Sequence, residues 1–349
     1  MNVNLFRIYI IISIIIIIYA SVFSNNETFK SSRVLTLLHH QNTPYQDIKL
    51  YKTQEYKKNF NLKNKIDYYL LLNNMIQFHT REYQLSHNLQ GLYPLFKYSP
   101  KKVLILGGGD GFFADLASKT KSVENITLVE IDQGMINMVK TNKTMRALTD
   151  DVFNKPNINI IINNAIDWIF KTNNKYDLII EDIELDYTKQ NSKDKIQKKG
   201  WTRKDKTYLD ILKQYFYIAD TISISIEIEE TLTKNKIPSN LNKNPRISHL
   251  LWKNNKNRFI KITDEKILEI LFFELMIERI PWKNTMDYSE LYKIIDFVKD
   301  KNIYFGAYHD EDTNPKDITN SYVKKSKKLP NLGFEGYLII SKINHKYEI

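Results

Sequence analysis

The fold is decided by the stretch Val103-Leu104-Ile105-Leu106-Gly107-Gly108-Gly109-Asp110-Gly111. Four consecutive apolar residues are typical of a strand that is buried on both faces, as in a parallel sheet. The glycines behind it let the backbone turn tightly and approach a ligand. A helical pattern through Ala114, Leu116 and Ala117 follows directly. A strand, a glycine loop and a helix in this order predict the first unit of a parallel α/β sheet.

The same alternation continues toward the C-terminus. Strand patterns at Ile126–Val129, Ile158–Ile162 and Tyr176–Ile180 are separated by helical patterns. This spacing predicts an α/β fold, namely a Rossmann-like doubly wound sheet. We expect a helix at Tyr208–Phe216 and further strands at Ile222–Ile228, Ile303–Tyr308 and Tyr337–Ser341, with mostly helical structure over residues 230–300.

The residues before this sheet have a different pattern, of short strands and turns. Ile48–Tyr51 alternates like a strand, and Tyr68–Leu72 and Met75–Phe78 flank Asn73-Asn74 as a hairpin flanks its turn. We therefore expect a small N-terminal β-strand domain at residues 25–96 and a Rossmann-like catalytic domain at residues 97–349.

The first 24 residues form a segment of their own. Arg7 precedes a nearly pure apolar run from Ile8 to Tyr19, and small or polar residues follow up to Ser24. The run is shorter than the roughly 20 residues that a membrane helix needs. Residues 1–24 are expected to be a secretory signal peptide or an uncleaved membrane anchor, and both remain open. Either predicts a membrane-anchored, or a secreted or luminal, protein.

Composition excludes several kinds of site. The net charge is +11, but the lysines are spread along the chain and no basic stretch is interleaved with aromatic residues in a known reader pattern, so no nucleic-acid partner is expected. The chain has no cysteine, and its seven histidines show no metal-ligand spacing. We expect no metal and no permanently bound cofactor.

Polar residues stand where the predicted parallel strands end, and in such sheets ligands bind beyond that edge. Asp110, Glu130, Asn164 and Asp182 all occupy this edge. The carboxylate of Glu130, about 20 residues after the glycine loop, is placed to accept hydrogen bonds from both hydroxyls of a ribose. Dinucleotide enzymes and methyltransferase-like enzymes share this pairing. The alternative is that Glu130 is a solvated strand end.

Asp110 narrows the choice of ligand, because it puts a negative charge inside the glycine loop. It would repel a pyrophosphate, which argues against NAD, and also the carboxylate of S-adenosylmethionine. The ammonium of decarboxylated S-adenosylmethionine would be attracted. The alternative is that Asp110 caps the following helix, and the two roles are compatible.

Several motifs in order resemble the spermidine synthases, the polyamine aminopropyltransferases. The resemblance covers roughly residues 34–225 and returns at the last strand. It is carried by Leu37–His40 leading to Tyr45–Ile48, by Leu70–Gln77 with Thr80-Arg81-Glu82, by Tyr93-Pro94-Leu95, by Val103–Gly111, by Tyr176–Asp182 and by Gly336–Lys342.

The resemblance implies a class I methyltransferase-like fold and transfer of an aminopropyl group from decarboxylated S-adenosylmethionine to an amine acceptor, with release of 5'-methylthioadenosine. It also implies a homo-oligomer. Asp182 would be the general base on the attacking amine. The cosubstrate would be bound by Gln46, Gly107, Gly109, Asp110, Glu130, Asn164 and Ala165.

Departures from the family pattern concern the acceptor side. Ser86 and His87 stand where the family carries a Tyr-Gln pair, and its second acid is displaced to Glu184 or Asp186. His87, Glu184 and Asp186 are therefore expected to bind substrate together with Asp110 and Asp182. Two alternatives remain open: a non-catalytic membrane-associated or secreted binding protein on the same fold, and a methyltransferase that uses intact S-adenosylmethionine.

Overall fold

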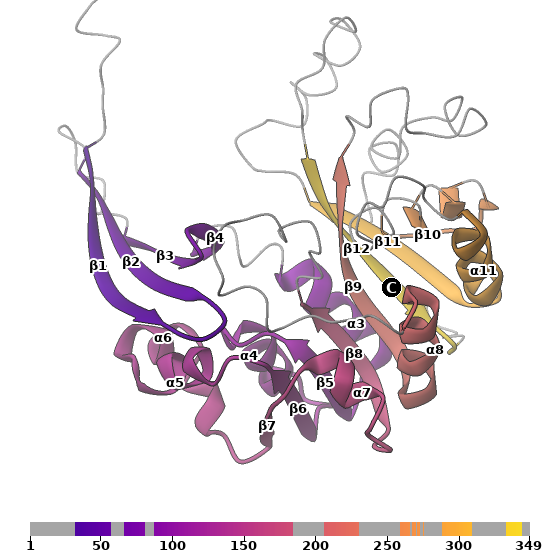
Figure 1. The fold of residues 1–349 in the computed structure, drawn as a ribbon, viewed down its shortest axis with the longest axis horizontal. Coiled ribbons are helices and arrows are strands. Elements are labelled where there is room, and N and C mark those ends of the chain that lie inside the picture. Colours follow the sequence, from indigo (N-terminus) through magenta and orange to yellow (C-terminus); the bar gives the residue numbers. More distant parts are fainter. Residues whose placement is uncertain are drawn as a thin grey trace, which may run out of the picture.

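The structure, a computed structural model, describes residues 32–56, 66–80, 87–183, 206–229, 259–265, 288–308 and 333–343, with 267–269, 271, 272 and 275 between them. These residues form a four-stranded sheet and an eight-stranded sheet (Figure 1). The expected signal peptide or anchor at residues 1–24 lies outside the described residues. Within the described part, no helix combines the length and the apolar character needed to cross a bilayer.

The four-stranded sheet is antiparallel and has the order β1-β2-β3-β4. Asn73 and Asn74 have φ angles of 52° and 64°, as a two-residue hairpin turn requires, so the expected hairpin is confirmed. The strands are β1 (Ser32–Asn42), β2 (Asp47–Tyr56), β3 (Ile66–Leu72) and β4 (Met75–His79).

The eight-stranded sheet has the order β10-β11-β12-β9-β8-β5-β6-β7. Its β9-β8-β5-β6-β7 half is parallel, and β12, β11 and β10 add to β9 as antiparallel strands. The predicted Rossmann-like sheet is confirmed. The strands are β5 (Lys102–Gly107), β6 (Asn125–Glu130), β7 (Ile158–Ile162), β8 (Tyr176–Asp182), β9 (Ala219–Glu229), β10 (Phe259–Lys261), β11 (Asn302–Tyr308) and β12 (Gly333–Ser341).

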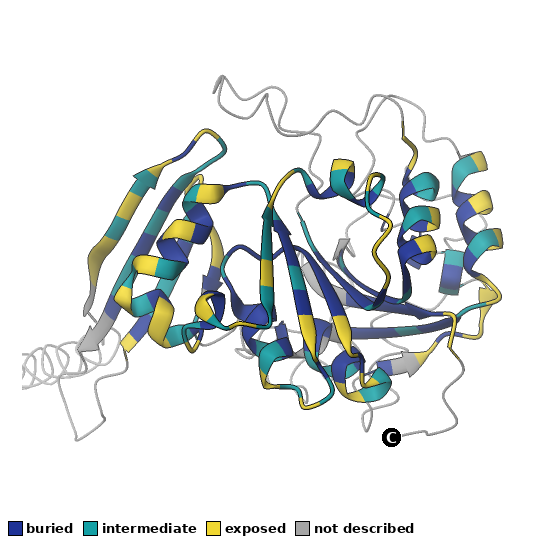
Figure 2. Cartoon of the chain, turned by 90° about the horizontal axis from the view of Figure 1, so that it is seen from below, coloured by how far each residue is buried: buried dark blue, intermediate teal, exposed yellow. Residues whose placement is uncertain are grey.

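Helices cover both faces of the eight-stranded sheet (Figures 1 and 2). Alternate residues of β5 divide between two cores: Val103 and Ile105 face one, and Leu104 and Leu106 face the other. The helices are α3 (Tyr93–Tyr98), α4 (Phe112–Lys119), α5 (Gln133–Thr141), α6 (Lys143–Leu148), α7 (Ala165–Ile169), α8 (Tyr208–Ile218) and α11 (Tyr288–Val298), with the short turns η1 (Asn88–Leu92) and η2 (Val152–Asn154).

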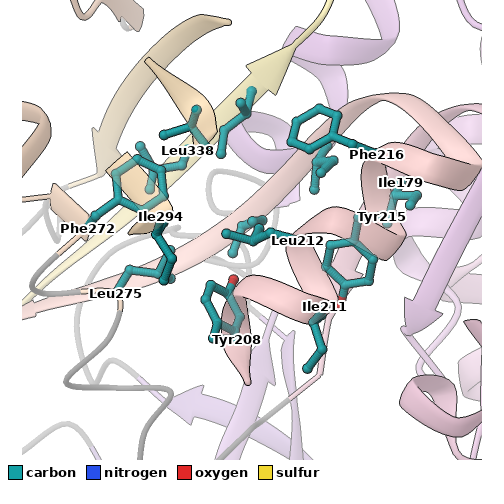
Figure 3. Close-up of a cluster of buried hydrophobic side chains, with 14 of the residues drawn as sticks. Ile179, Tyr208, Ile211, Leu212, Tyr215, Phe216, Phe272, Leu275, Ile294 and Leu338 are labelled. Carbon is teal, nitrogen blue, oxygen red and sulfur yellow. The ribbon is translucent and has the colours of Figure 1, made fainter. Parts of the chain in front are cut away.

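The larger core lies under α7, α8 and α11. Figure 3 shows Leu212 of α8 beside Ile294 of α11 and Leu338 of β12, and all three are fully buried. Because full burial of such a side chain contributes about 1.5–3 kcal/mol, this packing holds the antiparallel half of the sheet to the parallel half.

The second core joins the N-terminal sheet to the parallel half of the eight-stranded sheet. Ile48, Leu50 and Leu70 are fully buried in one cluster with residues of β5 and α4. The rings of Phe78 and Phe112 meet edge to face at 4.7 Å between centroids. The N-terminal sheet is therefore held against α4, the helix that the glycine loop begins. The domain boundary expected between residues 96 and 97 stays a prediction.

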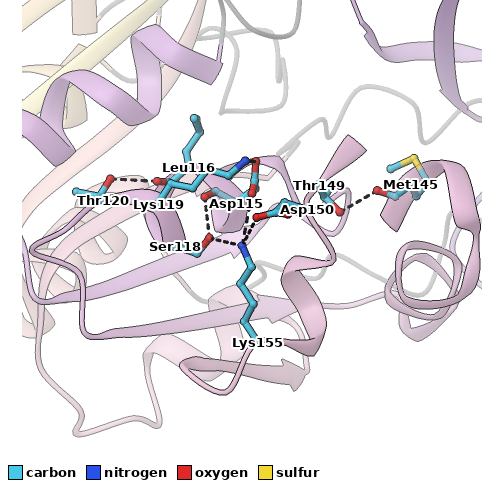
Figure 4. A network of polar contacts seen from close by, with 9 residues as sticks. All are labelled: Asp115, Leu116, Ser118, Lys119, Thr120, Met145, Thr149, Asp150 and Lys155. Carbon is cyan, nitrogen blue, oxygen red and sulfur yellow. Dashed lines mark hydrogen bonds and ion pairs between the residues drawn. The ribbon is translucent and has the colours of Figure 1, made fainter. Parts of the chain in front are cut away.

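A polar network anchors the outer side of α4 (Figure 4). Asp115 is bonded by Lys119 at 2.6 Å, and Lys155 reaches Asp150 at 2.9 Å and the hydroxyl of Ser118 at 3.1 Å. Burial raises the pKa of the Asp115 carboxyl, while the ammonium groups of Lys119 and Lys155 oppose that rise. The network holds the outer side of α4 in place, while the N-terminus of the helix follows the glycine loop.

The segment at 230–300 was expected to be mostly helical, and its described residues are mostly helical, with the short strand β10 in addition. A three-residue strand at a sheet edge is too short to leave a periodic pattern. One expectation needs correction: the last strand begins earlier than Tyr337, because β12 pairs with β9 from Gly333 onward.

Candidate active site

The glycine loop adopts a backbone that only glycine tolerates well. Gly107, Gly108 and Gly111 have φ angles of 81°, 68° and 89°. A β-carbon on Gly107 would lie 2.0 Å from the carbonyl oxygen of Asp182. On Gly108 it would lie 3.7 Å from the carboxylate oxygen Oδ2 of the same residue. The loop is therefore packed directly against the end of β8, where the predicted base stands.

The other side of the loop meets the end of β6. A β-carbon on Gly109 would lie 2.8 Å from Oε2 of Glu130 and 2.9 Å from Cγ of Met135. Gly109 needs no left-handed backbone here, so its role is to leave room beside a carboxylate. The structure thus brings four predicted residues together: Gly109 lies beside Glu130, and Gly107 lies beside Asp182.

Glu130 has an unusual acidity. Burial raises the pKa of its carboxyl to about 7, and the nearby carboxylates of Asp132 and Asp110 add to the rise. The backbone N–H groups of Asp132 and Ile131 oppose it, the former at 2.8 Å from Oε1. A carboxyl group with this pKa changes charge near neutral pH, and groups with such shifted values are candidates for a functional site.

Asp132 is a site residue that the sequence reasoning missed. It is 1% exposed, and its Oδ2 accepts hydrogen bonds from the hydroxyl of Thr43 and from Nε2 of Gln46, both at 2.8 Å. Its Oδ1 accepts from the N–H of Gly134 and so caps α5. An Asp directly before a helical pattern is a recognisable N-cap signal, but nothing in the sequence shows that it also binds Gln46.

A hollow of about 370 Å³ opens beside this cluster. Its lining comes from the β1–β2 turn and from the start of α5, so it lies between the N-terminal sheet and the parallel sheet. Glu130, Asp110 and Asp182 are not among its lining residues. These are Gln41, Asn42, Thr43, Pro44, Tyr45, Ile131, Asp132, Gln133, Gly134, Asn137 and Ile162.

Asp110 divides its carboxylate between two neighbours. Its Oδ1 accepts a hydrogen bond from the N–H of Phe112 at 3.1 Å, but the N-cap of α4 is Gly111, so Asp110 lies one residue before the cap position that was expected of it. Its Oδ2 lies 3.7 Å from Nε2 of His87, and both side chains are nearly buried, at 12% and 11% exposed. The imidazole packs on Phe113, with 4.4 Å between ring centroids. The loop carboxylate and His87 therefore form one cluster, and binding of an ammonium by Asp110 stays a prediction.

Asn164 and Ala165 follow β7 at the same edge of the sheet. The side-chain oxygen of Asn164 accepts hydrogen bonds from the N–H groups of Ile166 and Asp167, at 2.9 and 3.1 Å. It is thus the N-cap of α7, and Ala165 is the first residue of that helix and is buried. Contact of these two residues with an adenine remains a prediction.

Two predicted substrate residues cannot be placed. Glu184 and Asp186 lie outside the described residues, as does Ser86. Within the described ranges, no three His, Asp or Glu side chains are grouped as a metal ion requires. The described residues thus place a glycine loop between two carboxylate-bearing strand ends, with a buried polar cluster beside it.

Comparison with known proteins finds one family. Residues 84–203 match the spermine/spermidine synthase domain. The chain is 32% identical over 166 residues to the polyamine aminopropyltransferase of Methanocaldococcus jannaschii, a match covering 47% of this chain and 52% of that protein. The corresponding enzyme of Leptospira interrogans is 28% identical over 155 residues, covering 44% and 31%. The chain thus spans about half the length, or less, of these curated relatives.

Two solved structures are also similar. One is a crystal structure of spermidine synthase in complex with the transition-state analogue AdoDATO, with a TM-score of 0.41 and 22% identity over 55% of this chain and 57% of that one. The other is spermidine synthase from Thermotoga maritima, with a TM-score of 0.40 and 21% identity over 57% and 59% of the two chains.

Proposed function

Because residues 84–203 match the spermine/spermidine synthase domain, we propose that the chain is an aminopropyltransferase. It transfers the aminopropyl group of decarboxylated S-adenosylmethionine to an amine and releases 5'-methylthioadenosine. The observation that carries this proposal is the position of the glycine loop, which touches Glu130 at Gly109 and Asp182 at Gly107. One loop thereby lies between a carboxylate for a ribose and a carboxylate for an amine.

The nucleoside half rests on Glu130. Ionised Glu130 accepts hydrogen bonds from the two ribose hydroxyls, since a carboxylate has about four acceptor sites. One of its oxygens is already oriented by the N–H of Asp132. Gln46, held by Asp132, reaches the same region from the N-terminal sheet.

Binding of the aminopropyl end of the cosubstrate depends on Asp110. Its carboxylate stands in the glycine loop, where Oδ1 accepts from the N–H of Phe112 and Oδ2 lies 3.7 Å from Nε2 of His87. An ammonium next to it is favoured, and a second carboxylate is repelled. The negative charge of Asp110 therefore favours decarboxylated S-adenosylmethionine over the intact form.

The reaction needs a neutral amine and an acceptor for its proton. The amine nitrogen attacks the methylene carbon next to the sulfonium, and a C–N bond forms. The C–S bond breaks and its electron pair stays on sulfur, giving the neutral thioether. Asp182 orients the amine and takes the proton that nitrogen loses. Its carboxylate also stabilises the positive charge that develops on nitrogen.

Calorimetry of the full chain tests the nucleoside half. Titrations use 5'-methylthioadenosine, S-adenosylmethionine and decarboxylated S-adenosylmethionine. The decarboxylated form is expected to bind more tightly than the intact form, and Asp110→Asn is expected to erase that preference while 5'-methylthioadenosine still binds. Equal or tighter binding of the intact form would favour a methyltransferase instead. Binding of none of the three would favour a non-catalytic protein on this fold.

A turnover assay tests the chemistry. Putrescine, cadaverine and spermidine are offered as acceptors, and release of 5'-methylthioadenosine is measured. Asp182→Asn is expected to lower kcat at least a hundredfold, as loss of a positioned base does, and to leave the Kd for 5'-methylthioadenosine within about twofold. A variant that keeps kcat would show that Asp182 is not the base.

A further inference from the structure

A cluster of buried polar side chains lies under the carboxyl end of β8. Nε2 of Gln90 donates to the backbone carbonyl of Glu181 at 2.7 Å, and the hydroxyl of Ser223 donates to the backbone carbonyl of Gln90 at 2.7 Å. The hydroxyl of Tyr215 donates to Oε2 of Glu181 at 2.6 Å. Gln90 is 3% exposed, and the other three residues are fully buried. Four elements, namely η1, α8, β8 and β9, thus meet at Glu181.

A polar cluster is unexpected at this position, because this face of β8 packs in the core. Ile179, two residues earlier on the same face of β8, packs in the large apolar core. Alternation therefore predicts an apolar residue at 181, where the chain has a glutamate. Burying polar groups costs free energy unless they are hydrogen-bonded. The chain has polar residues at these buried positions, although apolar side chains would avoid that cost.

The short turn η1 connects this cluster to the other half of the site. It has π-helical hydrogen bonding, which occurs mostly as single turns and frequently at functional sites. His87, directly before it, lies 3.7 Å from Asp110 in the glycine loop. Gln90, three residues later, is bonded to the residue that precedes Asp182. The turn η1 and the residue before it therefore contact both the glycine loop, which carries Asp110, and the end of β8, which carries Asp182.

We propose that Gln90 is a positioning residue for Asp182. Its amide fixes the end of β8 relative to η1, and so fixes the carboxylate of Asp182 relative to Asp110. This inference rests on the proposed function, since positioning matters only if the amine and the aminopropyl group must meet in line. Displacements of about 1 Å can lower such rates by up to a hundredfold.

The expected phenotype separates turnover from binding. Gln90→Leu removes the amide but keeps a side chain of similar size in the core. It is expected to lower kcat on the order of tenfold. The Kd for 5'-methylthioadenosine is expected to stay within twofold, because Glu130 and Asp132 are untouched. Ser223→Ala, which removes only the hydroxyl that holds the carbonyl of Gln90, is expected to do the same more weakly.

Amide hydrogen exchange on the full chain tests the anchor without any turnover. In Gln90→Leu, and to a smaller extent in Ser223→Ala, exchange over residues 178–183 is expected to rise relative to wild type. The matched control is Thr221→Ala: Thr221 is also fully buried on β9, but its hydroxyl bonds Ser341 at 2.9 Å, and it lies opposite Leu178 of β8, four positions before Asp182. This variant is expected to change neither exchange at 178–183 nor kcat.

The outcomes are distinguishable. Unchanged exchange over 178–183 in the two folded variants would overturn the inference. Raised exchange with unchanged kcat would also overturn it, because the amide would then be structural only. A wild-type chain that turns over no amine would sink the proposed function, and exchange alone would then decide whether Gln90 anchors β8.

Discussion

Nε2 of Gln46 lies 2.8 Å from Oδ2 of Asp132, although 86 positions separate the two residues in the chain. The hydroxyl of Thr43 donates to the same oxygen at 2.8 Å. The turn between β1 and β2 is thereby bound to the start of α5, two residues after Glu130. A buried carboxylate with this many donors joins the N-terminal sheet to the segment that carries Glu130.

Asp132→Ala is expected to weaken both the fold and the site. The hydroxyl of Thr43 and the amide of Gln46 would lose their buried acceptor, which costs about 1–3 kcal/mol in the free energy of unfolding. The affinity for 5'-methylthioadenosine should fall at least tenfold, because Gln46 is no longer held. Urea unfolding and calorimetry measure the two effects.

Asp177→Ala provides the matched control. Oδ2 of Asp177 also accepts two hydrogen bonds, from the N–H groups of Lys101 and Lys102 at 2.7 and 2.8 Å, but at the opposite edge of the sheet. This variant should lose stability and keep its nucleoside affinity. An equal loss of affinity in both variants would mean that Asp132 acts only through stability.

Nucleoside binding is expected to depend on pH through Glu130. The pKa of its carboxyl is raised to about 7 by burial, and only the ionised form can accept bonds from both ribose hydroxyls. At pH 6 about one tenth of the carboxyl groups are ionised, and at pH 8 about nine tenths are. The Kd for 5'-methylthioadenosine should therefore fall about tenfold over this interval, and Glu130→Gln should abolish the dependence. A flat profile in the wild type would contradict this role.

The same carboxyl group should make stability decrease with rising pH. The folded protein holds the proton of Glu130 more tightly than the unfolded chain, whose value is near 4.5. This contribution is fully present below about pH 4.5 and is lost as pH rises through about 7. The wild type minus Glu130→Gln difference in unfolding free energy should shrink over that window by a few kcal/mol. Urea titrations at several pH values measure it, and a difference independent of pH would disprove the linkage.

Alanine substitutions at two glycines of the loop should have different effects on affinity and stability. In Gly109→Ala the new methyl group would meet Oε2 of Glu130 at 2.8 Å, so nucleoside affinity should fall tenfold or more with little loss of stability. In Gly111→Ala the neighbouring atoms are at 3.3 Å or beyond, but φ is 89°. That variant should lose about 1 kcal/mol of stability and keep its affinity. Thermal unfolding and calorimetry measure the two effects in both variants. A reversed pattern would refute the assignment.

Tyr215→Phe should be destabilising because Glu181 would lose its buried donor. The expected cost is about 1–3 kcal/mol in the free energy of unfolding. Tyr176→Phe is the matched control: its hydroxyl is also buried, and in the described part of the chain it has no hydrogen-bond partner. Removing that hydroxyl should leave stability unchanged or slightly raised. Equal costs for the two variants would show that the Tyr215 hydrogen bond contributes nothing.

Much of the site could be predicted from local patterns. Asp110, Glu130, Asn164 and Asp182 each follow an apolar strand, and parallel strands bring their carboxyl ends to one edge. Asp132 and Gln90 escaped prediction because their partners lie 86 and 91 positions away. A hydrogen bond between such distant residues leaves no periodic trace in the sequence.

The amino-acid sequence by itself determined the alternating strands and helices and the glycine loop, since each depends on neighbours within a few positions. Only the tertiary structure decided that Asp110 shares its carboxylate between the N–H of Phe112 and His87, that Gln46 is held by Asp132, and that Gln90 supports the end of β8. The physical reason is that burial and hydrogen-bond partners of polar side chains are set by packing between elements, and packing is a property of the assembled chain.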